Sequence, residues 1–240
     1  EAIAEAGFDA VELHEPDFMG DAGTAKEVAK KARALGLRIE VQQPFHDFEG
    51  QNGETREFAF ARLDQKLDLM NELGAKTLLI GASTSSNCEP EQIIADFTEL
   101  AEITAAKGLR AALIALPWAS HITKETQALE VVNAVDHPSF GLALNSFFSL
   151  ADGSQAARLR DVPGEKLFHV QLSDAPGIDF DISGLKSHFG LLPGQGDLNL
   201  ESFVRVLARA GYQGPWSLAR VSDAMQSGRP TYARDGFRAL

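Results

Sequence analysis

The stretch KLDLMNELGAKTLLI, residues 66–80, decides the fold class of this chain. Its first half carries apolar side chains at helical spacing and ends at Gly74, and its second half closes with the short apolar run 77–80. Glycine ends helices because it adopts positive φ without a steric penalty. A helix that leads directly into a buried strand is the unit that repeats in α/β proteins with parallel strands.

The same alternation continues outward in both directions. Short apolar runs predict seven strands, at residues 10–13, 37–42, 77–80, 109–116, 140–144, 166–172 and 216–219. Amphipathic runs, most of them closed by glycine, predict helices at residues 1–6, 22–35, 57–73, 91–107, 124–135, 156–160 and 201–210. Each crossover is long enough to return the chain for parallel pairing.

Repeating β/α units fit either an open doubly wound sheet or a (β/α)8 barrel. Neither GxGxxG nor GxxxxGK[ST] follows a strand, which disfavours the nucleotide-binding open sheet. The long loops 43–56, 81–90 and 173–199 all follow strands, on the face where barrels carry their active sites. Because the chain opens in a helix with no strand before it, we expect one α/β domain over residues 1–240, a (β/α)8 TIM barrel lacking its first strand. The expected core includes Val11, Leu13, Leu78, Ile80, Leu142 and Val170.

Composition excludes several classes of partner. The 240 residues include 22 Lys and Arg and 34 Asp and Glu, so the net charge is −12 and the chain repels a phosphate backbone. No apolar run reaches the ~18 residues of a membrane span. We therefore expect neither nucleic acid nor a membrane as partner. The single cysteine, Cys88, excludes an intramolecular disulfide, and we expect a reducing, cytoplasmic setting.

Eight colinear segments carry a resemblance to a known family. They are AGFDAVELHEPDF (6–18), QPFHDFEG (43–50), KLDLMNELGAKTLLI (66–80), LPWASH (116–121), HPSFGLALNSFFSL (137–150), FHVQLSDAP (168–176), LPGQGDLNL (192–200) and RPTYARDGFRAL (229–240). They resemble the bacterial 3-dehydroshikimate dehydratases of the xylose isomerase-like TIM barrel superfamily, which also holds sugar phosphate isomerases and epimerases. The order and spacing of the segments are kept over the whole chain. In that family the first strand and first helix precede the position of Glu1, which agrees with the missing strand.

The resemblance implies a lyase or isomerase that uses a divalent metal. In these dehydratases an ion such as Mg²⁺, Mn²⁺ or Co²⁺ is held at the barrel mouth by a Glu, an Asp, a His or Gln and a second Glu, from four strand ends. With the metal bound, 3-dehydroshikimate loses water to give protocatechuate. The implied partner is a small-molecule hydroxy acid or sugar-like ligand, and a homo-oligomer is left open.

This chain departs from the family pattern at the metal. Aligned on LPW, the first Glu position holds Ile114, and aligned on NSFFSL, the Asp position holds Asn145. Gln171 keeps its place in HVQLSD, and Ala219 stands where the second Glu belongs. The three replaced ligands include every carboxylate, and carboxylate oxygens are the ligands that hold Mg²⁺ or Mn²⁺. We therefore expect no metal and no other cofactor.

Positions near the substrate differ as well. His46 and Ser120 stand where the family pattern leads us to expect arginines, and Phe148 replaces a histidine. A site for a carboxylate-bearing substrate is therefore weakened. His121, just past the fifth strand of the complete barrel and beside Trp118, is the best surviving acid–base candidate. The alternative is that His121 is a solvated loop histidine.

Polar residues at strand ends are the candidates for substrate binding. We expect contacts from Glu12, His46, Trp118, Asn145 and Gln171. For Glu12 and its neighbour Glu15 the alternative is a solvated rim. For the acidic pair Asp47 and Glu49 we favour a role as hydrogen-bond acceptors within their own loop.

Two features after the strand at residues 166–172 have open interpretations. His169 and Gln171 should share one face of that strand, because alternate residues of a strand do. Asp174 either contacts a ligand or caps the next turn. The loop Pro193–Gly196 either offers backbone N–H groups to an anion or is a simple turn, which we favour.

Three interpretations of function remain. The chain is an enzyme of the dehydratase and isomerase superfamily with metal-free or altered chemistry. Alternatively, it is a non-catalytic ligand-binding or structural barrel, a pseudoenzyme. In the third interpretation it keeps a metal through ligands outside the family pattern. Metal-dependent stabilisation separates the third from the others, and turnover of 3-dehydroshikimate separates the first from the second.

Overall fold

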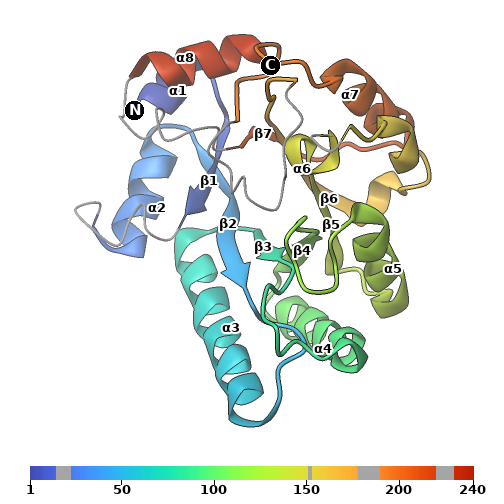
Figure 1. Ribbon diagram of the computed structural model, residues 1–240. Helices are drawn as coiled ribbons and strands as arrows, with labels where there is room; N and C mark the ends of the chain where they lie inside the picture. The colour runs from blue at the N-terminus through green and yellow to red at the C-terminus, as the bar shows by residue number, and fades with distance from the viewer. Residues whose placement is uncertain (15–22, 151–152, 178–189, 220–229) are drawn as a thin grey trace. The chain divides into compact units, whose positions relative to one another are not determined.

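The computed structural model describes residues 1–14, 23–150, 153–177, 190–219 and 230–240, in which strands and helices alternate along the chain (Figure 1). The strands are β1 (Ala10–His14), β2 (Arg38–His46), β3 (Thr77–Gly81), β4 (Arg110–Ile114), β5 (Phe140–Asn145), β6 (Leu167–Leu172) and β7 (Trp216–Leu218). The sheet order is β1-β2-β3-β4-β5-β6-β7. The ladders from β1 through β5, and from β6 to β7, are parallel. The seven predicted strands are confirmed.

Helices follow the strands as the glycine pattern predicts. They are α1 (Ala2–Ala6), α2 (Ala25–Ala34), α3 (Gly53–Leu73), α4 (Ile93–Ala106), α5 (Glu125–Val135), α6 (Ser146–Leu150), α7 (Leu200–Arg209) and α8 (Pro230–Ala239). The described residues also form the 3₁₀ turns η2 (Pro90–Gln92), η3 (Ala156–Leu159) and η4 (Gly164–Lys166). The predicted helix at 156–160 is the 3₁₀ turn η3, and α6 and α8 were not predicted. Within the described ranges, no helix is both long and apolar enough to cross a membrane.

The connection after β2 was predicted wrongly. In place of a loop over residues 43–56, β2 continues to His46 and α3 begins at Gly53. A proline within an apolar run usually marks the end of a strand, because it has no N–H for the ladder. Here the register of the β2–β3 ladder shifts around Pro44, so the strand passes the proline and resumes pairing. The extension carries His46 to the end of the strand.

Packing divides the chain into two compact units. One is Asp9–Leu142, and the other combines Glu1–Phe8 with Ala143–Leu240. In the first unit Phe97 of α4 stacks on Phe140 of β5, with ring centroids 4.9 Å apart. This contact identifies the face of the sheet that the helices cover.

Register assigns the other strands of the first unit to the same two faces. The helix-covered face carries, in register across β5, β4, β3 and β2, Phe140, Ala111, Leu78 and Gln42. By alternation the opposite face carries residues such as Glu12, His14, Gln43, Gly81 and Ile114. The opposite face therefore carries Glu12 and His46, two of the residues that were predicted to bind substrate.

The predicted core is mostly confirmed. Leu78, Ile80, Leu142 and Val170 are fully buried. Val11 and Leu13, however, are only half-buried, like every residue of β1. Alternating apolar residues predict which side of a strand is buried, but the burial of a strand also depends on the strands beside it. Because β1 stands at the end of the strand order, only β2 lies beside it among the described strands.

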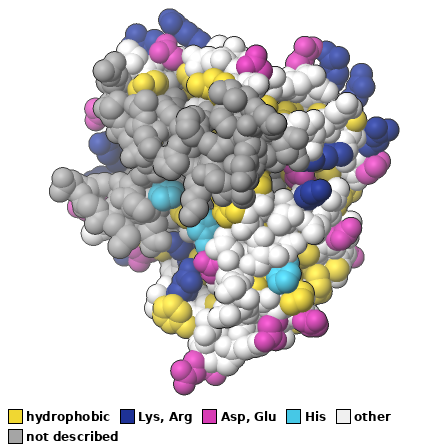
Figure 2. Space-filling model, viewed as in Figure 1, with side chains coloured by type: hydrophobic (Ala, Val, Ile, Leu, Met, Phe, Trp, Pro, Cys, Tyr) yellow, Lys and Arg dark blue, Asp and Glu magenta, His cyan; other side chains and the backbone are white. Residues whose placement is uncertain are grey.

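The second unit buries β6 along its whole length. Phe203 and Leu207 of α7 are fully buried, and the ring of Phe8 meets that of Phe237 of α8 edge to face, with centroids 5.2 Å apart. On the face shown in Figure 2, described acidic and basic side chains are interspersed. Charge on that face is therefore dispersed rather than gathered into one patch.

Candidate functional site

Polar side chains of β1 and β2 meet at the strand ends of the unit Asp9–Leu142. His14 pairs in register with Gln43, and the side-chain amide of Gln43 donates to Glu12 Oε2 over 2.5 Å. Both partners of that hydrogen bond are half-buried. Glu12 thus lies at the place predicted for a substrate contact, held by a neighbour rather than solvated alone. Glu15 lies outside the described residues.

His46 ends β2 and lies over the end of β3. Its Cα pairs with that of Gly81, and a Cβ at Gly81 would lie 2.3 Å from His46 Nδ1. Only glycine leaves room for the imidazole there. Desolvation lowers the pKa of His46, and the nearby His14 and Arg62 lower it further, against an opposing effect of Asp47. A lowered pKa favours the neutral imidazole, so His46 does not replace the charge of an arginine.

His121 and Trp118 lie on the loop after β4. His121 Nε2 is 2.8 Å from the carbonyl oxygen of Cys88. Because a carbonyl only accepts, Nε2 carries the hydrogen, and Nδ1 is left as the ring atom that can take a proton. Ser120 of the same loop donates its hydroxyl to the carbonyl oxygen of Ser85 over 2.6 Å. The position expected to hold an arginine therefore joins two loops.

The acidic pair after β2 accepts hydrogen bonds, as predicted, but from the loop after β3 rather than from its own loop. Asp47 Oδ1 accepts from the Thr84 N–H at 2.8 Å, and Glu49 Oε1 accepts from the Ser83 N–H at 2.6 Å. Their partners lie on a neighbouring loop rather than on their own, which the sequence pattern does not indicate. Glu49 is buried, and that burial could not be predicted from its polar surroundings in the sequence.

Asn145 and Gln171 form a buried amide pair in the second unit. Asn145 Nδ2 donates to Gln171 Oε1 over 3.0 Å, and each residue is only 5% exposed. The backbone N–H of Phe147 donates to Asn145 Oδ1 at 3.0 Å. A backbone N–H can only donate, so it fixes the oxygen of Asn145 on that side and the amide nitrogen toward Gln171.

Two serines close the same network. Ser146 Oγ donates to the carbonyl oxygen of Ser173 over 2.6 Å and accepts from the Ser173 N–H at 2.9 Å. Both serines are buried. One hydroxyl therefore satisfies both backbone groups of Ser173, and uncharged hydrogen bonds join the end of β6 to the start of α6.

His169 faces a partner that sequence reasoning missed. Its Nε2 lies 3.1 Å from the hydroxyl oxygen of Ser217 on β7. His169 is fully buried, whereas Ser217 is half-buried. A lone serine in a strand carries no sequence signal of such a pairing, because the contact depends on the register of two strands.

Asp174 caps the loop that was considered as an anion site. Its carboxylate accepts from four backbone N–H groups, those of Ala175, Gly194, Gly196 and Leu198, at 2.8–3.1 Å. A Cβ at Gly196 would lie 2.3 Å from the carbonyl oxygen of Ala175, so glycine permits this close turn. The anion bound by the loop is therefore the chain's own carboxylate, in agreement with the turn we favoured.

The four family ligand positions do not fit a divalent cation. Ile114 and Ala219 offer no lone pair, and the amide oxygens of Asn145 and Gln171 already accept hydrogen bonds. In the described part of the chain, no three His, Cys, Asp or Glu side chains are grouped so that they could hold a metal ion. The donor chemistry that a hard cation requires is missing from these positions.

The chain is similar in sequence to proteins known as dehydratases and isomerases. It is 36% identical to a 3-dehydroshikimate dehydratase of Pseudomonas putida and 38% identical to one of Pseudomonas aeruginosa, over its whole length. The chain spans 38% of the length of each. Inosose isomerase of Bacillus subtilis is 34% identical over 48% of the chain and 41% of that protein.

Solved structures support the same fold. A fusion protein of a xylose isomerase-like TIM barrel and 4-hydroxyphenylpyruvate dioxygenase gives a TM-score of 0.95 with 35% identity, over all of this chain and 39% of the other. The IOLI protein with a bound zinc atom gives a TM-score of 0.87 with 21% identity, over 99% of this chain and 88% of the other, and this likeness shows the fold alone. The family model "Xylose isomerase-like TIM barrel" matches residues 1–240. The predicted TIM barrel is thus confirmed, and the chain belongs to the xylose isomerase-like TIM barrel family.

Proposed function

We propose that this chain is a barrel of the 3-dehydroshikimate dehydratase type that has lost metal-dependent dehydration and binds a small ring ligand without converting it. The observation that carries the proposal is the amide pair Asn145–Gln171 at two of the family's ligand positions. The pair is uncharged, and its oxygens already accept hydrogen bonds. It therefore satisfies buried polar groups that a cation would otherwise have to bind.

The hydrogen bond of His121 bears on the choice between binding and catalysis. In a metal-free dehydration a histidine would have to remove a proton next to the substrate carbonyl. His121 instead donates from Nε2 to the Cys88 carbonyl, so one ring nitrogen already serves to join two loops. Nδ1 remains able to take a proton, so this contact fits either interpretation, and a turnover assay decides between them.

The strand ends of the first unit favour a ligand rich in hydroxyl groups. Glu12, Gln43 and His46 there offer a carboxylate, an amide and an imidazole with a lowered pKa. Such groups hydrogen-bond to hydroxyls, whereas a ligand carboxylate would face the charge of Glu12 without an arginine at position 46. A sugar-like ligand is therefore the better candidate, and a hydroxy acid is the second.

Turnover of 3-dehydroshikimate tests the proposal. The purified chain is incubated with this compound and with Mg²⁺, Mn²⁺ or Co²⁺, and in parallel with a chelator, and protocatechuate is measured. The Pseudomonas putida relative serves as the positive control. We expect no protocatechuate under any condition. Product that requires a metal would refute the proposal, and equal product with chelator would establish the metal-free dehydratase instead.

Ligand binding is tested separately, by the change in melting temperature with 3-dehydroshikimate or inosose present. We expect saturable stabilisation that is weakened at least tenfold in Glu12→Gln. Glu57→Gln, on the exposed side of α3, is the matched control and should bind like the wild type. Equal affinity of all three proteins would exclude Glu12 from the binding site, and no stabilisation by either compound would count against both ligand classes.

A further inference from the structure

Three loops of the first unit are joined by hydrogen bonds into what we call the three-loop cluster, residues 47–51, 83–90 and 116–122. The N–H of Ser120 donates to the Ser83 carbonyl, and the N–H of Glu89 donates to the Gly50 carbonyl, both at 2.8 Å. The loops follow β2, β3 and β4, so they lie at the carboxyl ends of adjacent strands. The cluster therefore lies at this edge of the sheet.

The carboxyl group of Glu49 is buried in the three-loop cluster, and only one of its two oxygens accepts a hydrogen bond from another described residue. The residue is 1% exposed, and its Oε1 accepts the Ser83 N–H at 2.6 Å. Its Oε2 is buried and has no hydrogen-bond partner in the described part of the chain. An ionised carboxylate has about four acceptor sites to satisfy, so this environment penalises the charge.

The groups that face Glu49 add to that penalty. Asp47 precedes it in the same loop, Asp96 reaches it from α4, and the buried thiol of Cys88 faces it from the loop after β3. Arg56 of α3 pairs with Asp96 at 2.8 Å and with Glu99 at 2.6 Å. Arg56 therefore neutralises Asp96, and no described residue supplies a counterion to Glu49.

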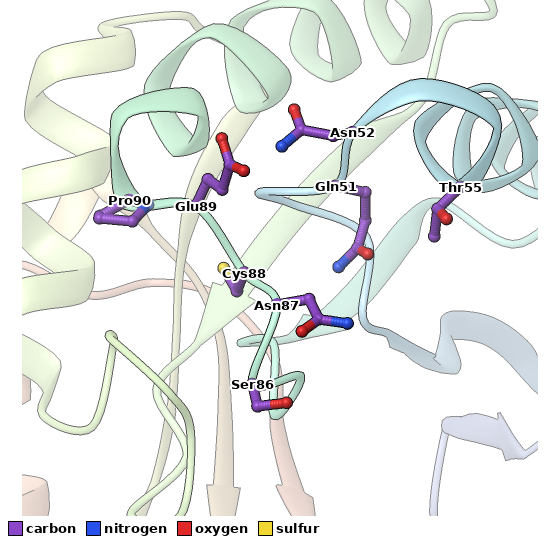
Figure 3. Close-up of a pocket in the computed structure, with 8 residues that line it drawn as sticks. All are labelled: Gln51, Asn52, Thr55, Ser86, Asn87, Cys88, Glu89 and Pro90. Carbon is purple, nitrogen blue, oxygen red and sulfur yellow. The ribbon is translucent and has the colours of Figure 1, made fainter.

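We propose that Glu49 is a proton-dependent lock: protonated, it holds residues 47–51 against residues 83–90, and on losing its proton it releases that contact. Ionised Glu49 gains hydration only if these segments separate, because no described group can neutralise it in place. Separation would widen a pocket of about 530 Å³ between the two segments, lined by residues that include Gln51, Asn87 and Cys88 (Figure 3). The lock acts on the loops and is independent of what the barrel binds.

The size of the effect follows from the two states of the carboxyl. Burial first, and then Asp47 and Asp96, raise the pKa of Glu49 to about 7, against opposing effects of the Ser83 N–H and of its own backbone N–H. The ordinary value is 4.5, which the opened loop would restore. Because the pKa of Glu49 is higher in the closed form than in the opened form, the closed form loses stability as the pH rises. Between pH 6 and pH 8 the population of the opened form should rise about tenfold.

Cys88 is a built-in reporter of opening. It is the single cysteine, it is 6% exposed, and its thiol lies 3.5 Å from the Glu49 carbonyl oxygen. Burial raises the pKa of the Cys88 thiol to about 11, so labelling proceeds through the opened form. The labelling rate with a neutral alkylating reagent is measured from pH 6 to pH 8 and divided by that of a cysteine peptide. We expect the corrected rate to rise about tenfold in the wild type.

Two variants separate the lock from other causes. Glu49→Gln keeps an oxygen for the Ser83 N–H but cannot ionise, so its corrected rate should not change with pH. Glu89→Gln removes an exposed carboxylate of the same cluster and should behave like the wild type. A tenfold rise that persists in Glu49→Gln, or a flat profile in the wild type, overturns the proposal.

Amide exchange keeps the test valid if Glu49→Gln does not fold. In the wild type the Ser83 amide should lose protection about tenfold between pH 6 and pH 8, beyond the intrinsic effect of pH. The amide of Leu79, in the middle of β3, should stay protected far longer than Ser83. If both amides exchange at one rate, the loops open only when the whole unit unfolds, and the lock is refuted.

Discussion

The side-chain amide of Asn145 donates to that of Gln171 over 3.0 Å, and the N–H of Phe147 fixes which way this amide points. In the family pattern both positions face a cation. Here two neutral groups satisfy one another, so the end of β5 is joined to β6 without an ion. The hydrogen-bonding needs of these two side chains are thus met within the chain.

A double-mutant cycle measures the pair. Asn145→Leu should lower the free energy of unfolding by about 2–4 kcal/mol, because the buried N–H of Phe147 and the side-chain oxygen of Gln171 lose their hydrogen bonds to Asn145. Gln171→Leu should cost about 1–3 kcal/mol. The double variant should lose less than the sum, with a coupling of about 1–2 kcal/mol measured by urea unfolding. Strict additivity would mean that the amide contact contributes nothing.

Gln42 gives the opposite prediction. It lies on the helix-covered face of β2, it is 0% exposed, and neither end of its amide has a partner among the described residues. Replacing an unsatisfied buried amide with an apolar side chain of similar size removes a desolvation penalty. Gln42→Leu should therefore raise the free energy of unfolding by about 1–3 kcal/mol. Gln43→Leu, which breaks the bond to Glu12, is the control and should not stabilise. Destabilisation by Gln42→Leu would show that its amide is satisfied after all.

Glu49 predicts how stability depends on pH. Its pKa in the folded chain, about 7, lies above the ordinary 4.5, so between these values the folded state binds the proton more tightly than the unfolded state. The stabilisation is complete below pH 4.5 and is lost as the pH rises through 7. Glu49→Gln should remove this loss, so its stability relative to wild type should rise by about 3 kcal/mol between pH 4 and pH 8. A pH-independent difference between the two proteins would contradict this prediction.

The repeating part of the fold could be predicted from local signals. Apolar strands, amphipathic helices and the glycines that end them fix the order of β1 to β7, because each signal lies within one segment. The errors arose where the outcome depends on distant contacts. The strand β2 passes Pro44 because β3 offers pairing beyond it, and the short helix α6 begins where Asn145 caps it through the Phe147 N–H.

For the candidate site, too, the sequence predicts the positions of the residues but not their hydrogen-bond partners. The positions of Glu12 and His46 at strand ends, and the apolar side chains at Ile114 and Ala219, can be read from the sequence. The partners cannot, because the amide of Gln43, the thiol and carbonyl of Cys88, and Ser217 meet their contacts only through register and loop packing. A single sequence indicates which residues could take part in binding or catalysis. Tertiary contacts determine which of these side chains already have hydrogen-bond partners.

Metal binding tests the central claim most directly, namely that the chain has lost its family's cation. Wild-type protein is titrated with Mn²⁺ and its free energy of unfolding is followed. The comparison is a triple variant that restores the family pattern beside Gln171. It carries Ile114→Glu, Asn145→Asp and Ala219→Glu. The wild type should show no stabilisation, whereas the triple variant should gain about 2.7 kcal/mol at a hundredfold excess over its dissociation constant. Stoichiometric, saturable stabilisation of the wild type by Mn²⁺ would contradict the account.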